Sequence, residues 1–403
     1  MSDREVALAI NPARSSTDQP PAQPSVQGFE SLALMRASAP SMRDDSLGAD
    51  LFFTLAWFDN LASHGLDAQW KPLWLLLHAT SGEACLPMAW QPRAAVAVFG
   101  PVLSSMANYY ASLYGPVSEG DGPSLEACLA LVHHLRLTPL RCGVVNFHPL
   151  DADGHFFRRL QHALRAQGWW TDTYFCFGNW HLRVDGRSFE QYFPTVPSRI
   201  RNTIRRGRKK LDEAGAWSLH IESVPGPALE QAISDFEAIY RKSWKVPEPF
   251  PQFVPGLCRS AAGHGWLRLG VVRLGPTPIA AQLWLIRDGK AQIYKLAYDE
   301  EFKRFSAGSV LTAEMMRQAI DIDRADDIDY LTGDDDYKAD WMSHRRERVG
   351  IVAFDPRTLQ GLASALRHRG GRWLQRLRAR LAPGAPTVMA PVTAPGTPTG
   401  AAP

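Results

Sequence analysis

The sequence predicts a mixed α/β protein of the α+β class, with mostly antiparallel mixed sheets flanked by helices. The first observation is a run of three segments rich in β-forming residues and separated by turns, at residues 266–274, 279–287 and 290–298. The second is the adjoining stretch, which has a glycine-bearing loop, apolar residues at helical spacing over 309–320, and a short apolar run at 328–331. Together they predict an antiparallel meander that leads through a loop into a helix and a further strand.

This strand, loop and helix arrangement has a chemical consequence. The first turn of a helix carries backbone N–H groups without partners and the positive end of the helix dipole. Beside a strand, these groups suit a phosphate or a pyrophosphate. The loop at residues 299–309 contains neither a Walker sequence nor GxGxxG, but it carries Lys303 and Arg304. Pyrophosphate binding and an ordinary strand-to-helix turn both remain open for this loop.

Composition bounds the class of protein. The chain has 403 residues, of which 45% are hydrophobic and 21% charged, as in soluble globular proteins, and its length favours two domains. The net charge of +3 is too small to predict a polyanionic partner from the total. The five cysteines are scattered without ligand spacing, so we expect reduced core residues. With no signal-peptide pattern and no membrane-length apolar run, we expect a cytosolic protein, with peripheral association at the inner face of the membrane as a further possibility.

Domain organisation follows from shifts in composition. Stretches rich in Pro, Ser, Ala and Gly mark disordered ends, and arginine-rich stretches mark two basic helices. The predicted segments are a tail (1–47), an N-terminal domain (48–190), a basic linker helix (191–216), a C-terminal domain (217–356), a basic amphipathic helix (357–381) and a second tail (382–403).

The two domains show a related order of elements. In the first we predict helices at 50–61, 125–135 and 156–167 and strands at 71–78, 86–90, 94–99, 143–147 and 175–184. In the second, a strand at 218–224 and helices at 227–244 and 252–262 precede the meander. A duplicated architecture is therefore expected, although no repeat is visible at the level of residues.

Seven basic residues crowd into about three turns of the first basic helix. Ser198 is its predicted N-cap and Gly215 its predicted C′ residue. A solvated linker helix and an anion-binding helix for nucleic acid, a nucleotide diphosphate or lipid head groups both remain open. The basic residues are Arg199, Arg201, Arg205, Arg206, Arg208, Lys209 and Lys210.

The second basic helix interleaves seven arginines with leucines and Trp373, with Gly370 and Gly371 as an interruption. No acidic residue follows Asp355. Such a segment lies on an anionic membrane surface or a partner, or it packs as a helix with an arginine face.

The acidic run GDDDYK at residues 333–338 admits three interpretations. Asp334 and Asp336 have the DxD spacing with which some glycosyltransferases hold a divalent cation. Alternatively, a carboxylate beside Tyr337 acts as a general base, with Lys338 neutralising charge, or the run is a solvated turn. The calcium-loop pattern fails and the histidines show no ligand spacing, so no metal site is predicted.

Three stretches carry a family resemblance: SRIRNTIRRGRKKLDEAG, AQLWLIRDGKAQIYKLAYDEEFKRFSAGSVL and IDYLTGDDDYKADW. Together with TLAWFDNL they resemble the GNAT-superfamily acetyltransferases associated with bacterial cellulose biosynthesis (CelD type), which are related to the Fem-like peptidyltransferases. The resemblance covers about residues 51–354. It implies two tandem GNAT-like domains, the second of which holds acyl-CoA.

The resemblance also implies site residues. The acyl donor would meet Tyr298, Lys303, Arg304, Ser306, Gly308 and Ser309, and the acceptor side would include Gln282, Tyr294, Asp334, Tyr337 and Lys338, with Arg201 and Arg205 as further substrate contacts. The sequence departs from the usual GNAT pyrophosphate signature, because Arg304 is followed by Ala307, Gly308 and Ser309 rather than by two spaced glycines.

The leading hypothesis is an N- or O-acyltransferase that moves an acyl group, expected to be acetyl, from acyl-CoA to an amine or hydroxyl of a saccharide precursor or similar small molecule in envelope or exopolysaccharide metabolism. Asp334 is the predicted base and Tyr337 the predicted acid, so Asp334→Asn should lower turnover more than acyl-CoA affinity. The alternatives are Fem-like transfer from aminoacyl-tRNA, with the first basic helix on the RNA, and a non-catalytic scaffold for envelope assembly.

Overall fold

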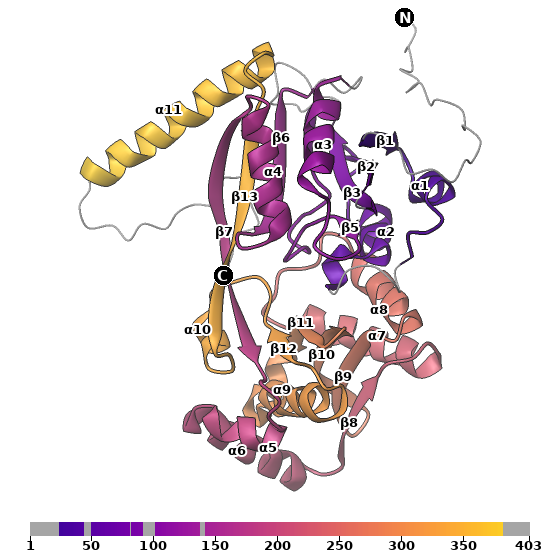
Figure 1. Cartoon of the computed structure of the whole chain (residues 1–403). Helices are drawn as coiled ribbons and strands as arrows, with labels where there is room; N and C mark the ends of the chain where they lie inside the picture. Colours follow the sequence, from indigo (N-terminus) through magenta and orange to yellow (C-terminus); the bar gives the residue numbers. More distant parts are fainter. Residues whose placement is uncertain (1–23, 44–49, 81, 92–100, 138–141, 382–403) are drawn as a thin grey trace, which may run out of the picture.

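A computed structural model describes residues 24–43, 50–80, 82–91, 101–137 and 142–381. Figure 1 shows two bodies, one formed mainly by the first half of the chain and one by the second, with strand β7 running between them. The predicted strand at 94–99 and most of both predicted tails lie outside the described residues.

One large mixed sheet runs through both bodies, in the order β1-β2-β3-β4-β6-β13-β7-β12-β11-β10-β9-β8, with β5 beside β3. The predicted class, a mixed sheet flanked by helices, is therefore confirmed. The strands are β1 (Ser25–Phe29), β2 (Lys71–Ala79), β3 (Gly82–Gln91), β4 (Val102–Ser105), β5 (Val117–Ser118), β6 (Val144–Asp151), β7 (Trp170–Arg183), β8 (Trp217–Glu222), β9 (Leu267–Leu274), β10 (Thr277–Arg287), β11 (Lys290–Tyr298), β12 (Asp327–Asp329) and β13 (His344–Phe354).

The helices cover the faces of this sheet. The main helices are α1 (Leu32–Ser38), α2 (Leu55–His64), α3 (Leu125–Leu137), α4 (His155–Ala166), α5 (Phe189–Tyr192), α6 (Ser198–Ala214), α7 (Pro227–Lys242), α8 (Phe253–Gly263), α9 (Ala307–Arg317), α10 (Asp336–Ala339) and α11 (Leu359–Leu381). Short 3₁₀ turns are η1 (Leu51–Phe53), η2 (Phe193–Thr195) and η3 (Glu300–Phe305), and a π-helical turn, η4 (Gln318–Ile322), extends α9.

The turn between β10 and β11 forms where the sequence predicts it. Asp288 and Gly289 both have positive φ, 45° and 73°, and this turn joins β10 directly to β11. Strand β10 is buried almost throughout and separates two hydrophobic cores, because alternate residues of a strand point to opposite faces. Leu283 faces the core that contains α2, α7 and α8, whereas Trp284 faces the core that contains α6 and α9.

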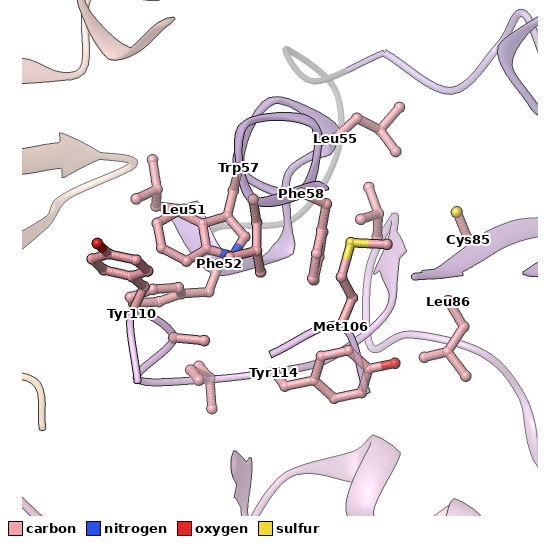
Figure 2. Packing of buried hydrophobic residues seen from close by; sticks show 14 of the residues in the cluster. Leu51, Phe52, Leu55, Trp57, Phe58, Cys85, Leu86, Met106, Tyr110 and Tyr114 are labelled. Carbon is pink, nitrogen blue, oxygen red and sulfur yellow. The ribbon is translucent and has the colours of Figure 1, made fainter. Parts of the chain in front are cut away.

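The first of these cores joins the two halves of the chain. Trp57 of α2 meets Phe52 edge to face, with ring centroids 4.7 Å apart (Figure 2). It also meets Phe253 and Tyr294 edge to face, at 5.6 and 6.0 Å. Phe253 and Tyr294 come from the second half. This core contains side chains from both halves of the chain. Aromatic packing across the boundary therefore holds the two halves together.

The last strands of the two halves are exchanged. Strand β13 follows the second half in the chain but pairs with β6 and β7, and β7 in turn pairs with β12. The sheet is continuous because each half supplies a strand to the other.

Three local predictions need correction. Residues 25–38, predicted as tail, form β1 and α1, because β1 pairs along the edge of β2 and Met35 is buried. The basic segment is not a linker but a packed element: α6 buries Ile204, Gly207 and Leu211 against α9. Ser198 is the first residue of α6 rather than its cap, which is Pro197.

Candidate functional site

The feature that defines the site is an opening between two parallel strands. Strands β11 and β12 pair only over the first three residues of β11, from Lys290 to Gln292. Beyond that, β11 continues beside β10 as far as Tyr298, with Tyr294 as an extra, bulged residue. The chain after β12 instead follows β7, where Tyr330 N donates to Trp180 O at 2.9 Å. In the described chain no strand therefore pairs with residues 293–298 on their β12 side.

The N-terminus of α9 lies at the end of β11. Ser306, with φ of 52°, turns the chain into α9 and makes no side-chain cap hydrogen bond. A Cβ on Gly308 would lie 3.5 Å from Cδ1 of Tyr298, so the first turn of α9 lies against the last residue of β11. The N–H groups of this turn lack intrahelical acceptors, as in any helix, and the turn lies at the end of the strand whose edge is unpaired.

Gln282 and Tyr294, both predicted to lie on the side of the acyl acceptor, stabilise this arrangement of α9 and β11. Buried Gln282 donates from Nε2 to Gly308 O at 3.1 Å and to Thr312 Oγ1 at 2.7 Å, which fixes α9 to β10. The Tyr294 hydroxyl donates to Tyr110 O at 3.1 Å. Their contacts make Gln282 and Tyr294 supports of the site rather than groups aimed at a ligand.

The predicted cationic residues divide into two groups. Lys303 and Arg304 are exposed at the last turn of η3, directly before α9, and Lys210 of α6 donates to Arg304 O at 3.0 Å. By contrast, Arg201 donates to Val196 O at 2.9 Å and Arg205 to Asn202 Oδ1 at 3.1 Å, within α6 and the turn before it.

Support for this loop comes from the close approach of α6. The place that a Cβ on Gly207 would occupy lies 2.6 Å from Phe305 O, so only glycine allows this contact. Arg208 forms an ion pair with Glu314 of α9. The basic helix thus combines a packed face with an exposed basic face.

Trp244 and Lys245 also lie beside the end of β11, although no pattern in the sequence predicts them. The Trp244 ring lies over Tyr298 with centroids 4.6 Å apart, and the Lys245 ammonium lies 5.5 Å from the Trp244 ring and 6.0 Å from the Tyr240 ring. Burial and the neighbouring Lys295 ammonium lower the pKa of Lys245 to about 8. Neither residue belongs to a spacing motif, so only tertiary contacts reveal them beside the end of β11.

Glu248 ties this region to the first half of the chain. It accepts hydrogen bonds from the hydroxyls of Tyr109 (2.5 Å) and Tyr110 (2.7 Å), and it pairs with Lys295 of β11 at 2.5 Å. Burial alone would raise the pKa of Glu248, but Lys295 and the hydroxyl donors lower it. The connection between α7 and α8 is therefore anchored beside the opening.

The predicted catalytic residues follow β12. Asp334 is held by Arg345, with Oδ2 to Nη2 at 2.7 Å, and this hydrogen bonding lowers its pKa. Lys338 is buried, donates to Thr332 O and lies 3.0 Å from Asp335, so it fixes the loop. The ring of Tyr337 is partly exposed and lies 5.7 Å edge-on from Tyr330, and partial burial raises its pKa to about 12.

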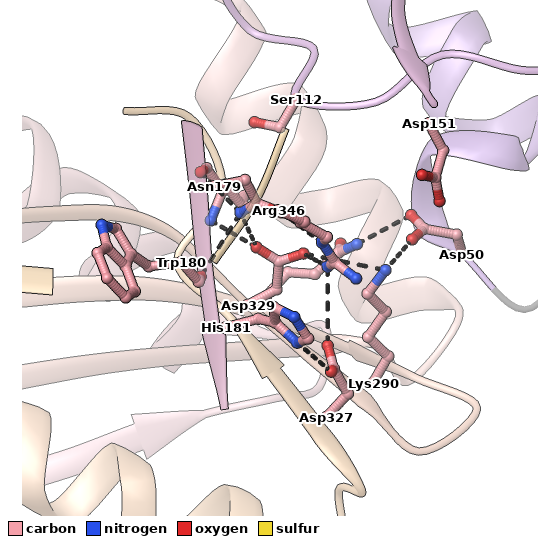
Figure 3. Close-up of polar contacts among 12 residues, drawn as sticks. Asp50, Ser112, Asp151, Asn179, Trp180, His181, Lys290, Asp327, Asp329 and Arg346 are labelled. Atoms are coloured by element: carbon pink, nitrogen blue, oxygen red, sulfur yellow. Dashed lines mark hydrogen bonds and ion pairs between the residues drawn. The ribbon is translucent and has the colours of Figure 1, made fainter. Parts of the chain in front are cut away.

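A buried polar network closes the other end of the opening (Figure 3). Asp329 accepts from Asn179 Nδ2 at 2.6 Å and pairs with Arg346, while Lys290 pairs with Asp50. Burial alone would raise the pKa of Asp329, but Lys290 and the arginines lower it to about 2. These contacts fix β11 and β12 together where they still pair.

Comparison with a family of known proteins agrees with this geometry. Residues 198–339 match the model of the acetyltransferase (GNAT) domain family, a span that includes the meander, the loop, α9 and β12. Residues 198–339 form a GNAT-type acetyltransferase domain. No match was found among curated proteins, and the CelD-type resemblance stays a prediction.

Solved structures show the same fold over more of the chain. FemX has 10% identity and a TM-score of 0.60, covering 84% of this chain and 99% of its own. The C-terminal domain (DUF2156) assigned to a lysylphosphatidylglycerol synthetase of Agrobacterium fabrum has 11% identity, a TM-score of 0.52 and coverage of 85% and 97%. A Bacteroides thetaiotaomicron protein of unknown function has 10% identity, a TM-score of 0.51 and coverage of 82% and 100%. At these identities the likeness concerns the fold, and it extends beyond the GNAT-type domain.

Proposed function

We propose that the protein transfers an acyl group, acetyl in the simplest case, from acyl-CoA to an amine or hydroxyl acceptor. The observation that carries this proposal is the divergence of β11 from β12 directly beside the uncapped N-terminus of α9. The unpaired edge of β11 suits the amide groups of a pantetheine arm, because an extended ligand adds to a free strand edge. The first turn of α9, with Lys303 and Arg304, suits the pyrophosphate.

In the proposed reaction the acceptor attacks the thioester carbonyl, a C–N or C–O bond forms, and the C–S bond breaks. Lys245, in its neutral form, takes the proton of the acceptor, since an amine with a pKa of about 8 is matched to this task near neutral pH. Tyr337, whose raised pKa keeps it protonated, gives a proton to the departing thiolate. Lys338 and Asp334 position the loop, and the Arg345 contact makes Asp334 a weaker base than the sequence suggested.

The acceptor is proposed to be a saccharide precursor or similar small molecule of envelope or exopolysaccharide metabolism. The CelD-type resemblance supports this assignment. The lipid named for the Agrobacterium synthetase domain is a second pointer toward the envelope, from a protein of the same fold.

Acetyl-CoA titration by calorimetry tests the donor site. Gly308→Val adds a branched side chain to the first turn of α9, where the backbone is proposed to approach the pyrophosphate, so we expect affinity to fall roughly 10-fold or more. Gly263→Val, at the end of α8 with open space around it, is the matched control and should bind normally. Equal affinity of both variants and the wild type would remove the donor site from α9.

Lys245 is tested by its pH profile in acetyl transfer to a panel of amino sugars and neutral sugars. We expect the rate to rise with pH and to level off near the Lys245 pKa of about 8. Both Lys245→Gln and Lys245→Arg should lower the rate roughly 100-fold and remove this inflection, since neither side chain exchanges the proton. Lys71→Gln, on β2, should leave the profile unchanged. Recovery of activity in Lys245→Arg would show that charge, not proton transfer, is what the site uses.

The exposed face of α6, with Arg205, Arg206 and Lys209, supports the aminoacyl-tRNA alternative. A titration with charged tRNA at several salt concentrations decides it, because contacts to phosphates weaken steeply with salt. Tight, salt-sensitive tRNA binding without acetyl-CoA binding would favour that donor.

A further inference from the structure

The last helix, α11, is attached to the sheet by one face only. Gln360 accepts from Gly143 N at 2.9 Å and donates to Pro101 O at 2.9 Å. About two helical turns further along, His368 Nε2 lies 2.7 Å from Asp172 of β7, and Arg372 pairs with the same carboxylate. Figure 1 shows the rest of α11 extending beyond the sheet. Its orientation relative to the body is therefore set by specific contacts.

The opposite face of α11 carries an apolar stripe. Leu359, Leu362 and Leu366 have the i, i+3, i+7 spacing of one helix face and are 81%, 37% and 61% exposed. In the sequence, Trp373 and Leu377 continue this spacing. Such a stripe is unusual on a free surface, because a helix normally buries its apolar face.

Positive charge surrounds this stripe. Arg367 and Arg369 are exposed beside Leu366, and residues 357–381 hold seven arginines. No aspartate or glutamate follows Asp355 to balance them. The combination of an apolar stripe with exposed arginines such as Arg367 and Arg369 is complementary to a surface that is apolar inside and negative outside.

We propose that α11 docks on an anionic lipid surface, with the stripe of Leu359, Leu362 and Leu366 at the boundary between head groups and acyl chains and the arginines among the head groups. A nucleic acid would engage the arginines but leave the leucines exposed to water. Since none of the described helices is both long and apolar enough to span a membrane, this contact would be peripheral. The proposal does not depend on the acyltransferase reaction.

Flotation of the full chain with vesicles tests this contact. We expect binding to vesicles of equimolar phosphatidylcholine and phosphatidylglycerol, weakened by salt, and no binding to phosphatidylcholine alone. The exposed-site variant Leu362→Glu/Leu366→Glu should lose roughly 10-fold or more of the binding, because it removes apolar contact and adds repulsion. Arg367→Gln/Arg369→Gln should bind more weakly and with a smaller dependence on salt.

The matched control is Leu34→Glu, which changes a leucine of α1 that is 49% exposed. It should bind anionic vesicles like the wild type. Equal binding to both vesicle types, or full binding by Leu362→Glu/Leu366→Glu, would overturn the proposal. So would lipid-free dimerisation, seen by sedimentation velocity and abolished by the same double change, because it would make a second copy the occupant of the stripe.

Discussion

The two halves of the molecule repeat one plan but differ at the point where a ligand would bind. Each half has an antiparallel meander, then a helix, then a strand parallel to the end of the meander: β2, β3, β4, α3 and β6 in the first, and β9, β10, β11, α9 and β12 in the second. In each half a pair of parallel strands is therefore connected through a helix. The expectation of a duplicated architecture agrees with this order.

In the first half the corresponding groups are already satisfied by the protein. Ser124 Oγ accepts from Ala127 N at 3.2 Å and caps the first turn of α3. The connection after β4 is filled by buried Tyr110 and Tyr114, and the Tyr114 hydroxyl donates to Pro87 O at 2.9 Å (Figure 2). In the second half Ser306 leaves α9 uncapped. We therefore expect a donor site only in the second half, where the first turn of α9 has no side-chain cap.

The closed ends of the two parallel pairs differ as well. At the last pair of β4 with β6, Asn146 accepts from the Tyr174 hydroxyl at 2.7 Å, a neutral contact. At the last pair of β11 with β12, Asp329 lies in a network of charged groups (Figure 3). In the second half, the last paired residues of the parallel strands are therefore held by buried charged groups. In the first half, they are held by a neutral hydrogen bond.

Removing the buried charge at Asp329 should produce the largest change in the free energy of unfolding. Asp329→Ala removes the buried carboxylate that pairs with Arg346 and accepts from Asn179 Nδ2, so we expect the free energy of unfolding to fall by about 3–5 kcal/mol, measured by urea denaturation. Asn146→Ala, the matched change in the first half, removes a neutral hydrogen bond and should cost about 1 kcal/mol. Equal losses in the two variants would mean that the charge of Asp329 contributes nothing to the free energy of unfolding beyond a neutral hydrogen bond.

The same variant should change the acid response. The folded pKa of Asp329, about 2, lies below its unfolded value, so its contribution is complete above about pH 4 and is lost as the pH falls toward 2. That contribution is about 2 kcal/mol, and the wild-type curve should lose it over this interval. Asp329→Ala should show a flatter decline, and parallel curves for the two proteins would contradict the assignment.

The smallest expected change in stability concerns the Ser124 cap, which distinguishes α3 from the uncapped α9. Ser124→Ala uncaps α3 and should lower the free energy of unfolding by about 1 kcal/mol without adding a second acetyl-CoA site to the one proposed at α9, since Tyr110 and Tyr114 still fill the space after β4. Thermal unfolding and calorimetry with acetyl-CoA measure the two quantities. Acetyl-CoA binding that persists in Gly308→Val but is lost in Ser124→Ala would place the donor site in the first half and reverse the comparison.

Local sequence determined much of the second half. The meander, its Asp288–Gly289 turn, the loop with Lys303 and Arg304 and the helix after it all follow from alternation, turn chemistry and helical spacing over short stretches. These signals involve neighbours in the chain, so no distant contact is needed to recognise them. The loop and the helix to which the donor is proposed to bind were predictable as elements for this reason.

The surroundings of the proposed acceptor side were less predictable, because they depend on residues far apart in sequence. Trp244 lies near Tyr298, and Glu248 meets Tyr109, through the packing of α7 and the connection after it. Asp334, which as part of an acidic run suggested a base, acquires a partner only when β13 brings Arg345 beside it. A residue's chemistry here depends on its partners, and sequence spacing does not specify them.

The sequence by itself determined most of the helices and strands and the mixed α/β class, since each rests on local propensity and periodicity. Only the tertiary structure decided that β7 and β13 are exchanged between the halves, that β12 follows β7 while β11 stays with β10, and that one helix N-terminus is capped and the other open. These outcomes depend on which distant strands pair through backbone hydrogen bonds. That pairing is established when the two cores pack against the shared sheet.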